Sequence, residues 1–206
     1  MNEYLSEMSL SDYFENLSSR QSVPGGGSAS ALAGALGAAL GCMAGNISET
    51  SVGDADYPQY SSVVQELSSI GSRLIKCVDR DAEVFESFLK VYRLPSDDPQ
   101  KNTLVEAALR EAASVPLEIA ELSARAIELL FDVRPYVKPA VISDVAVGAA
   151  LASAALKGGA INVKTNCISM TDRKCAAQLE NRITMLTAAY LPDAERLYRE
   201  IFTDLK

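Results

Sequence analysis

The chain has 206 residues, of which 48% are hydrophobic, so it can bury one sizeable core and is short for more than two domains. Its formal net charge is −8 and it has no tract of basic residues, which argues against nucleic acid as a partner. It contains no histidine, the commonest acid/base residue and transition-metal ligand, so carboxylates, hydroxyls, amides, Lys, Tyr or Cys must carry any chemistry.

The cysteine pattern favours a reducing compartment. Neither Cys-x-x-Cys pairs nor the spacing of metal ligands occurs among the four cysteines, Cys42, Cys77, Cys167 and Cys175. We expect them to be small buried side chains of a cytoplasmic protein that binds no metal. The N-terminal residues are acidic and polar, which predicts no signal peptide.

After a short amphipathic helix that begins at Ser9 or Ser11, the chain reads Ser-Val-Pro-Gly-Gly-Gly-Ser over residues 22–28. Three adjacent glycines open backbone conformations that other residues avoid and let a ligand approach the main chain. Ser28 is a candidate cap for the next helix, whose first N–H groups lack internal partners and carry partial positive charge. This combination predicts a loop and helix start that bind an anionic or carbonyl-bearing ligand. The alternative is a flexible glycine linker.

The helix that follows is rich in alanine and glycine. Every fourth residue is small, at Ala33, Gly37, Gly41 and Gly45, so one ridge of the helix has almost no side chain. Such residues weaken a helix, and they are useful where a neighbour packs unusually close, either within the chain or in a second copy. No charged residue lies in 21–48. Because small residues carry little transfer energy and no Lys/Arg asymmetry flanks them, we favour a buried helix of a soluble protein over a membrane span.

Helix breakers divide the middle of the chain. A polar break at 51–59 precedes a helical pattern that ends at a loop with two prolines, 94–99. The next helical pattern covers 104–131. Pro116 within it is expected to begin a new segment or to kink the helix, because proline removes one backbone hydrogen bond.

Two further helices complete the chain. Ser143-Asp144 is predicted to cap a helix whose small face includes Gly148, Ala152, Ala155 and Gly159. The last helix is expected to begin at Thr171 or Asp172 and to kink at Pro192. No segment shows sustained strand alternation, so the predicted fold class is all-α, a bundle of long helices.

Asp81 is the first candidate for chemistry. It borders the apolar side of its helix, within four residues of Val78 and Phe85. A carboxylate partly withdrawn from water has a raised pKa and can donate a proton near neutral pH. The alternative is a solvated acidic face, which we favour for Glu83 and Glu86.

The second candidate cluster is Ser143-Asp144 with Asn162 and Asn166. The two asparagines are one turn apart, and their amides can both donate to and accept from a flat heterocycle. Asp144 lies about 27 Å from Asn162 in a straight helix, so the two converge only if Gly158-Gly159 bends the chain or a second protomer contributes. The alternative is a set of helix caps and satisfied core amides.

Taken together and in order, these motifs resemble the formiminotetrahydrofolate cyclodeaminase / methenyltetrahydrofolate cyclohydrolase family. The resemblance covers nearly the whole chain. It rests on Pro-Gly-Gly-Gly-Ser-Ala-x-Ala at 24–31, Val-Asp-x-Asp-Ala-Glu-x-Phe at 78–85 running to Leu94-Pro95, Val115-Pro116-Leu117, Ser143-Asp144-Val145, and Asn162-Val163 followed by Asn166.

The resemblance implies a single all-helical domain over residues 1–206 that forms an intertwined or closely packed homodimer. It implies binding of a tetrahydrofolate derivative as substrate, with no prosthetic group. One branch of the family expels ammonia from 5-formimino-tetrahydrofolate, and the other hydrolyses the bridge of 5,10-methenyl-tetrahydrofolate. Because the bridge carbon is already electrophilic, this chemistry needs proton transfer and a positioned water or amine rather than a metal.

On this resemblance, the site residues have distinct roles. Asp81 is expected to be the acid/base residue and Asp144 a second carboxylate that holds the cationic or protonated heterocycle. The segment Pro24, Gly25, Gly26, Gly27 and Ser28 is expected to bind the folate through backbone donors, and Asn162 and Asn166 to orient its polar edges.

Two departures from the family pattern keep other functions open. Residues 51–56 are acidic where the family usually has a basic stretch, and 137–142 lack the usual Gly-Asn, although Lys138 there is positively charged. One alternative is a catalytically silent helical dimer that serves as a binding or scaffolding subunit. Another is an enzyme of the same scaffold with a smaller, less anionic substrate.

Overall fold

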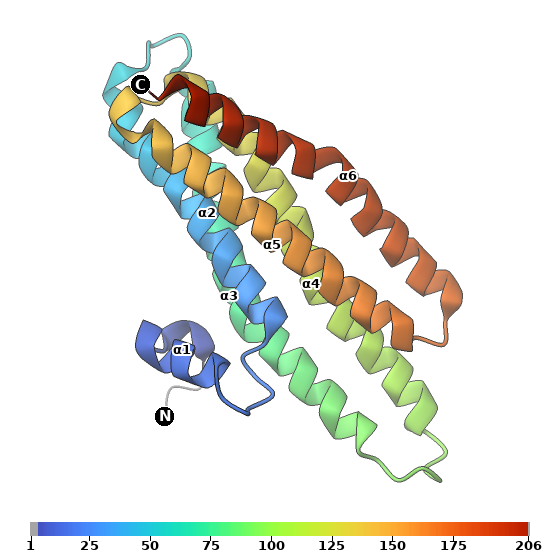
Figure 1. Cartoon of the computed structure of the whole chain (residues 1–206). Coiled ribbons are helices and arrows are strands. Elements are labelled where there is room, and N and C mark those ends of the chain that lie inside the picture. Colours follow the sequence, from blue (N-terminus) through green and yellow to red (C-terminus); the bar gives the residue numbers. More distant parts are fainter. Residues whose placement is uncertain (1–3, 206) are drawn as a thin grey trace.

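The helical patterns of the sequence become six α-helices in the computed structural model, which describes residues 4–205 (Figure 1). Among these residues there is no strand, and the predicted all-α fold is confirmed. The outermost positions of the predicted domain, 1–3 and 206, lie outside the described residues. The helices are α1 (Leu10–Leu17), α2 (Gly26–Ser48), α3 (Tyr57–Tyr92), α4 (Lys101–Val133), α5 (Ile142–Ser169) and α6 (Arg173–Asp204).

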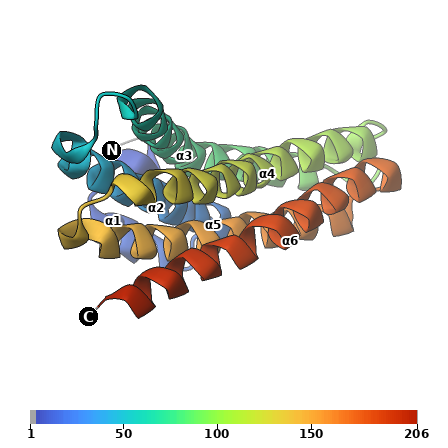
Figure 2. The same ribbon diagram turned by 90° about the horizontal axis from the view of Figure 1, so that it is seen from above.

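The five long helices pack side by side along one common direction (Figures 1 and 2). α2 contacts α3, α4 and α5, α4 also packs against α3 and α5, and α6 lies over α5 and α4. α2 and α5 are antiparallel, because Gly26 at the start of α2 lies beside Asn162 near the end of α5, and Gly37 lies beside Gly148. α1 lies near the beginning of α2, and the 3₁₀ turn Leu5–Glu7 before it packs against α3.

The small-residue ridge of α2 packs inside the chain. A Cβ atom on Gly37 would lie 2.8 Å from the carbonyl oxygen of Gly148, and one on Gly148 would lie 2.9 Å from that of Gly37. The backbones of α2 and α5 therefore touch. Farther along α2, a Cβ on Gly41 would meet Leu130 of α4 at 2.5 Å, and one on Gly45 would meet Val64 of α3 at 2.6 Å. The neighbours that the ridge predicts are thus helices of the same chain.

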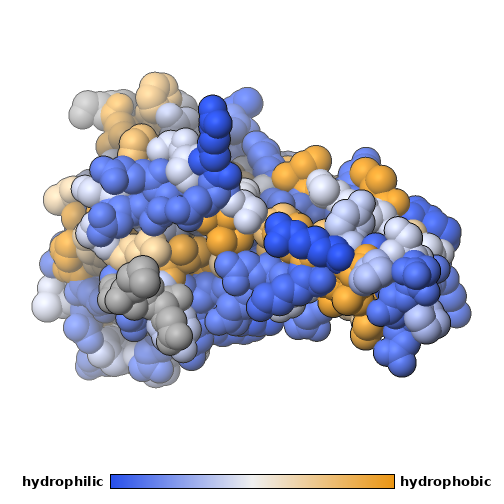
Figure 3. Space-filling model, turned by 90° about the horizontal axis from the view of Figure 1, so that it is seen from below, coloured by the Kyte–Doolittle hydropathy of each residue, from blue (hydrophilic) through white to orange (hydrophobic). Residues whose placement is uncertain are grey.

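By length and composition alone, the two segments Gly26–Ser51 and Pro139–Ser169 are apolar enough to cross a membrane. The apolar window of the first is 56% buried inside the bundle, as in a core helix of a soluble protein, and that of the second is 39% buried. On the face of the bundle seen in Figure 3, hydrophilic side chains cover most of the surface and smaller hydrophobic areas lie between them.

The predicted helix ends are partly wrong. Ser9 does cap α1, since its side chain accepts a hydrogen bond from the Asp12 N–H, and Asp172 caps α6. α2, however, begins at Gly26 with Gly25 as its N-cap residue, so Ser28 is inside the first turn. α5 begins at Ile142 directly after a 3₁₀ turn, Pro139–Val141, so Ser143-Asp144 also lies inside the helix.

No new segment begins at either internal proline. α4 continues through Pro116 and α6 continues through Pro192. Tertiary contacts hold both helices together along their length, and these outweigh the lost backbone hydrogen bond at each proline.

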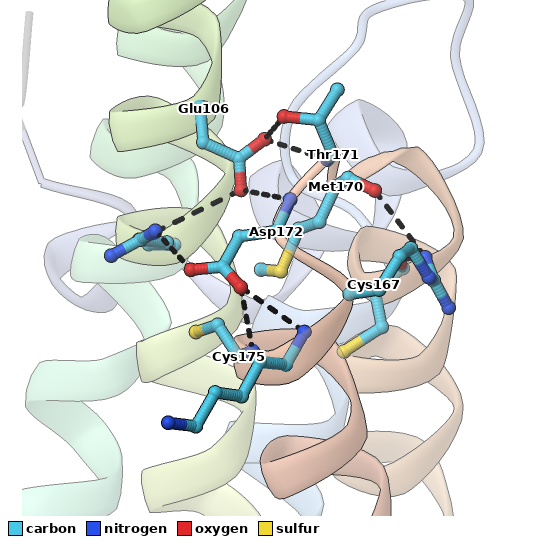
Figure 4. A network of polar contacts seen from close by, with 9 residues as sticks. Glu106, Cys167, Met170, Thr171, Asp172 and Cys175 are labelled. Carbon is cyan, nitrogen blue, oxygen red and sulfur yellow. Dashed lines mark hydrogen bonds and ion pairs between the residues drawn. The ribbon is translucent and has the colours of Figure 1, made fainter.

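Glu106 of α4 fastens the turn between α5 and α6 (Figure 4). Its carboxylate accepts hydrogen bonds from the Thr171 N–H at 2.7 Å, the Thr171 hydroxyl at 2.6 Å and the Asp172 N–H at 3.1 Å. Arg110 completes the network by donating to the Asp172 carboxylate at 2.6 Å. These hydrogen bonds, with Arg110 nearby, lower the pKa of Glu106, and they fix the end of α5 against α4.

We expect Glu106→Gln to lower the free energy of unfolding by about 1 kcal/mol at pH 7, because the amide replaces charge-assisted hydrogen bonds with neutral ones. A carboxyl whose pKa is lowered on folding stabilises the fold above its unfolded pKa, and that stabilisation is lost as the pH falls through the folded pKa. Urea unfolding at pH 7 should therefore separate the variant from wild type, and the difference should shrink as the pH is lowered toward 3. Glu86→Gln, on the exposed face of α3, is the control. An equal deficit at both pH values would contradict the role of the charge.

Candidate functional site

A cavity of about 200 Å³ lies where the start of α2 meets α3, α4 and α5. Its lining consists of Ser22, Val23 and the three glycines of the loop, Asp81, Val84 and Phe85 of α3, Ala112 of α4, and Asn162, Thr165 and Asn166 of α5. Four hollows elsewhere among the described residues are larger. One is lined mainly by apolar side chains, and each of the other three contains an arginine paired with acidic residues. The smaller cavity is the one in which a half-buried carboxylate faces two amides.

Asp81 is held by the first turn of α2. Its Oδ2 atom accepts a hydrogen bond from the backbone N–H of Ser28 at 2.9 Å. The carboxylate therefore caps α2 from a neighbouring helix, in place of the side chain that Gly25 lacks. Burial raises the pKa of Asp81, and the hydrogen bond from Ser28 opposes this rise only in part. The direction of the shift agrees with the predicted raised pKa, which favours the protonated form of the carboxyl.

Ser28 contacts this carboxylate through its backbone N–H and does not line the cavity. The residue is fully buried. Its hydroxyl donates to the Val78 carbonyl at 2.9 Å and lies 3.4 Å from the hydroxyl of Tyr13, the one buried residue of α1. Ser28 is therefore absent from the lining, and so is Pro24, which is also buried.

The three glycines matter for space and not for unusual backbone conformations. Among residues 4–205, no residue has a positive φ angle, and Gly25 is extended. A Cβ on Gly27, however, would lie 2.0 Å from the Asp81 Oδ1 atom, a separation that no side chain tolerates. A Cβ on Gly26 would lie 3.5 Å from the Asn162 amide, and one on Gly25 would be 3.9 Å from its nearest neighbour, both of which are ordinary contacts. Of the three, only Gly27 is a position where an added Cβ would displace a neighbour, the Asp81 carboxylate.

Asn162 and Asn166 both line the cavity, as the sequence predicts. Each uses its amide nitrogen within the protein. The Nδ2 atom of Asn162 donates to the Gly158 carbonyl at 2.7 Å, and that of Asn166 donates to the Ala112 carbonyl at 2.9 Å. Both amides are thereby oriented, and both keep an oxygen that can accept a hydrogen bond from a ligand.

Asp144 does not join these residues within one chain. It lies in the first turn of α5, which continues without a break through Gly158-Gly159 to Ser169. The distance along the helix to Asn162 is therefore about 27 Å. Bending at the glycines, one of the two ways in which these groups were expected to meet, is excluded, and only a second protomer can bring an Asp144 to this cavity.

Phe85 is the cavity residue that the sequence analysis assigned to the apolar core. Its side chain is 37% exposed and offers an aromatic face beside Asp81. The i, i+4 spacing between Asp81 and Phe85 places both on one face of α3, and this spacing could have revealed the pair. Nothing in the sequence indicated that Thr165 and Ala112 line a site, because threonine and alanine are common at helix positions without a functional role.

Comparison with known proteins connects this geometry to a family. A family model described as formiminotransferase-cyclodeaminase matches residues 9–185. The formimidoyltransferase-cyclodeaminase of Gallus gallus is 30% identical over 185 residues, which cover 86% of this chain and 34% of that protein. The methenyltetrahydrofolate cyclohydrolase of Methylorubrum extorquens is 28% identical over 200 residues, which cover 93% of this chain and 95% of that protein.

A solved structure has the same fold. The crystal structure of formiminotetrahydrofolate cyclodeaminase from Thermotoga maritima aligns with a TM-score of 0.84 over 98% of this chain and 97% of that chain, at 22% identity. The chain thus matches the cyclohydrolase and the Thermotoga protein over nearly their full lengths, but spans only about a third of the formimidoyltransferase-cyclodeaminases.

The steric role of Gly27 can be tested by Gly27→Ala, with Gly25→Ala as the matched control. We expect the first change to lower the free energy of unfolding by about 1–3 kcal/mol, because the new methyl group displaces Asp81 from the start of α2. The control should stay within about 0.5 kcal/mol of wild type in urea unfolding, since its new Cβ meets ordinary contacts. Equal stability of the two variants would mean that Asp81 does not pack against Gly27 as described.

Proposed function

We propose that this chain, which belongs to the formiminotransferase-cyclodeaminase family, is an enzyme that acts on the one-carbon bridge between N5 and N10 of tetrahydrofolate. Its relatives include proteins named for cyclodeaminase and for cyclohydrolase activity, which supports folate one-carbon chemistry. The observation that carries the proposal is the position of Asp81, a half-buried carboxylate of raised pKa that faces a cavity with two oriented amides.

Asp81 is the proposed acid/base residue. In hydrolysis, water adds to the cationic bridge carbon of 5,10-methenyl-tetrahydrofolate while the carboxylate accepts a proton from that water. The carboxyl then gives this proton to N5 as the bond from the carbon to N5 breaks, and the hydroxyl on the carbon loses its proton to solvent to give 10-formyl-tetrahydrofolate. In deamination, N10 attacks the formimino carbon and its proton passes to the formimino nitrogen. The protonated carboxyl gives that nitrogen a second proton, and it leaves as ammonia while the bridge becomes the methenyl cation. Both reactions need one group that accepts and donates protons at the bridge, and we assign this role to Asp81, whose pKa is raised by burial.

Relatives of both activities match this chain over nearly their full lengths, so length favours neither reaction. The remaining cavity residues have the same part in each. Asn162 and Asn166 offer amide oxygens to the polar edge of the ring, Phe85 offers an apolar face, and the N–H groups of Gly26 and Gly27 at the helix start offer donors.

A homodimer is part of the proposal because the cavity is small. Its volume of about 200 Å³ is below the roughly 300–1,000 Å³ of sites that enclose a whole ligand. On α5, Val147, Ala154, Ile161 and Ile168 are exposed at seven-residue spacing, and on α2, Leu36, Met43 and Ile47 are exposed. Such exposed apolar stripes are typical of helices that pack against a partner.

In an antiparallel two-fold arrangement, the partner's copy of Asp144 would lie near the cavity. The start of α5 in one protomer would then approach the start of α2 in the other, because α2 and α5 of one chain are themselves antiparallel. We therefore propose that Asp144 acts on the ligand bound to the other protomer.

The acidic segment 51–56 lies beyond the end of α2, remote from the cavity of its own chain. Lys138 is at the same end, where its ammonium group donates to the Ile47 carbonyl and to the Thr50 hydroxyl, both at 3.0 Å. Within one chain, therefore, this segment does not repel a ligand and Lys138 does not attract one. A silent binding subunit and an enzyme with a smaller substrate are the alternatives that the experiments below distinguish.

We expect Asp81→Asn to reduce turnover of methenyl- or formimino-tetrahydrofolate at least about 100-fold. The variant should keep wild-type stability or exceed it at pH 7, because a raised folded pKa means that the ionised carboxylate destabilises the fold above that pKa, and the difference should vanish below the unfolded pKa. Absorbance of the methenyl group follows turnover. Asp79→Asn is the control, because Asp79 lies outside the cavity. Its carboxylate accepts hydrogen bonds from the Ser6 N–H at 3.0 Å and from the Ser6 hydroxyl at 2.6 Å. A wild-type protein that binds 5-formyl-tetrahydrofolate without turnover would favour the silent subunit.

Mixing two inactive variants tests the shared site. If Asp81 and Asp144 of different protomers act on one ligand, Asp81→Asn and Asp144→Asn are each inactive. An equimolar mixture in which the two variants pair at random should then regain about a quarter of wild-type activity. Half of the dimers then carry one site with both aspartates. Activity is measured after co-refolding, and sedimentation confirms the dimer. No recovery in confirmed mixed dimers would overturn the shared site and remove Asp144 from the reaction.

A further inference from the structure

Pro116, which the sequence predicts to interrupt α4, lies inside the helix next to the cavity. A proline has no backbone N–H, so the carbonyl oxygen of Ala112, four residues earlier, receives no hydrogen bond from position 116. Ala112 is itself part of the cavity lining. The proline therefore exposes a strong acceptor at the wall of the proposed site.

Asn166 of α5 forms a hydrogen bond with this carbonyl. Its Nδ2 atom donates to the Ala112 carbonyl at 2.9 Å. Because a carbonyl oxygen only accepts, the amide must turn its nitrogen toward Ala112, and Oδ1 must be on the opposite arm of the amide. The orientation of this side chain thus follows from chemistry.

α4 and α5 approach each other closely at the same point. A Cβ on Gly159 would lie 2.7 Å from the Pro116 carbonyl oxygen and 2.9 Å from the Ala120 nitrogen, so the two backbones touch. Gly159 and Asn166 are seven residues apart and share a face of α5. The contact at Gly159 keeps Asn166 within reach of Ala112.

The amide of Asn162 is oriented in the same way, with its nitrogen hydrogen-bonded to the protein. Asn162 also donates an amide hydrogen to a backbone carbonyl, that of Gly158. Together with the carboxylate of Asp81, the side chains of the cavity offer oxygen acceptors, and among the described lining residues there is no lysine or arginine. Such side chains favour a ligand that presents N–H groups or positive charge.

We infer that Pro116 is a positioning residue for the proposed site: by withholding a backbone N–H from Ala112, it holds the Asn166 amide with its oxygen free to accept from the ligand. This inference rests on the proposed function and extends it. The substrate is recognised in its positively charged, N–H-bearing form, as the methenyl cation with its pterin N–H edge or as the protonated formimino group.

The first test needs no ligand. In ¹⁵N-labelled wild-type protein, the side-chain amide of Asn166, assigned by its loss in Asn166→Ala, should exchange with solvent more slowly than that of the exposed Asn181. In Pro116→Ala the restored N–H at position 116 competes for the Ala112 carbonyl, so this protection should fall at least about fivefold. Unchanged protection would overturn the inference, whether or not folate binds.

The second test is a double-mutant cycle on the affinity for 5-formyl-tetrahydrofolate. Pro116→Ala should raise the temperature of unfolding, since alanine suits a helix interior, and should weaken binding about fivefold. Asn166→Ala should weaken binding to a similar or greater degree, and the double variant should bind no more weakly than Asn166→Ala alone. A structural role alone would not raise stability while lowering affinity.

Pro192→Ala in α6 is the matched control. It also restores a backbone N–H inside a long helix, opposite Ala188, whose carbonyl receives no side-chain hydrogen bond among the described residues. It should raise stability without a change in affinity. Equal loss of affinity from Pro116→Ala with and without Asn166 would overturn the inference. If wild-type protein does not bind the folate, the proposed function fails, and the exchange measurement alone decides the role of Pro116.

Discussion

The hydrogen bond between the Ser28 N–H and the Asp81 carboxylate is the interaction on which the candidate site depends. It joins the first turn of α2 to the middle of α3 and supplies the cap that a glycine-led helix lacks. It also sets the chemistry of the carboxylate, since one hydrogen bond at a helix N-terminus opposes the desolvation that raises the pKa. Gly27 provides the space for this approach, and the hydroxyls of Ser28 and Tyr13 hold the turn from behind.

The close contacts of the α5 backbone with α2 and α4 position the two asparagines of the site. Because Gly37 and Gly148 let α2 and α5 touch, the end of α5 lies directly beside the glycine loop, and Asn162 reaches Gly26. Gly159 brings α5 equally close to α4, where Asn166 meets Ala112. The polar groups of the cavity therefore stand on rigid helices whose separation is fixed by glycine, which is the arrangement that preorganised sites require.

Using small residues for internal packing has a consequence at the surface. α2 and α5 turn their glycines and alanines inward, so several of their large apolar side chains, Leu36, Ile47, Ile161 and Ile168 among them, remain exposed. The proposed homodimer covers this face and enlarges a cavity that is too small to enclose a folate alone. In this proposal, packing inside one chain and association between two chains use different faces of the same two helices.

The amino-acid sequence alone was enough to predict the helices and half of the residues that line the cavity. Periodicity, breakers and the spacing of small residues predict the all-α fold and the close packing of α2, and Asp81, the three glycines, Asn162 and Asn166 do converge. Local rules gave Ser28 and Ser143-Asp144 as caps and a new segment as one of two outcomes at Pro116, because they consider only partners nearby in sequence. The tertiary structure decided these points: Asp81, 53 residues from Ser28, caps α2, and Asn166, 54 residues from Ala112, satisfies the carbonyl beside Pro116. It also separated Asp144 from the cavity, since a continuous helix fixes a distance that no sequence motif can shorten.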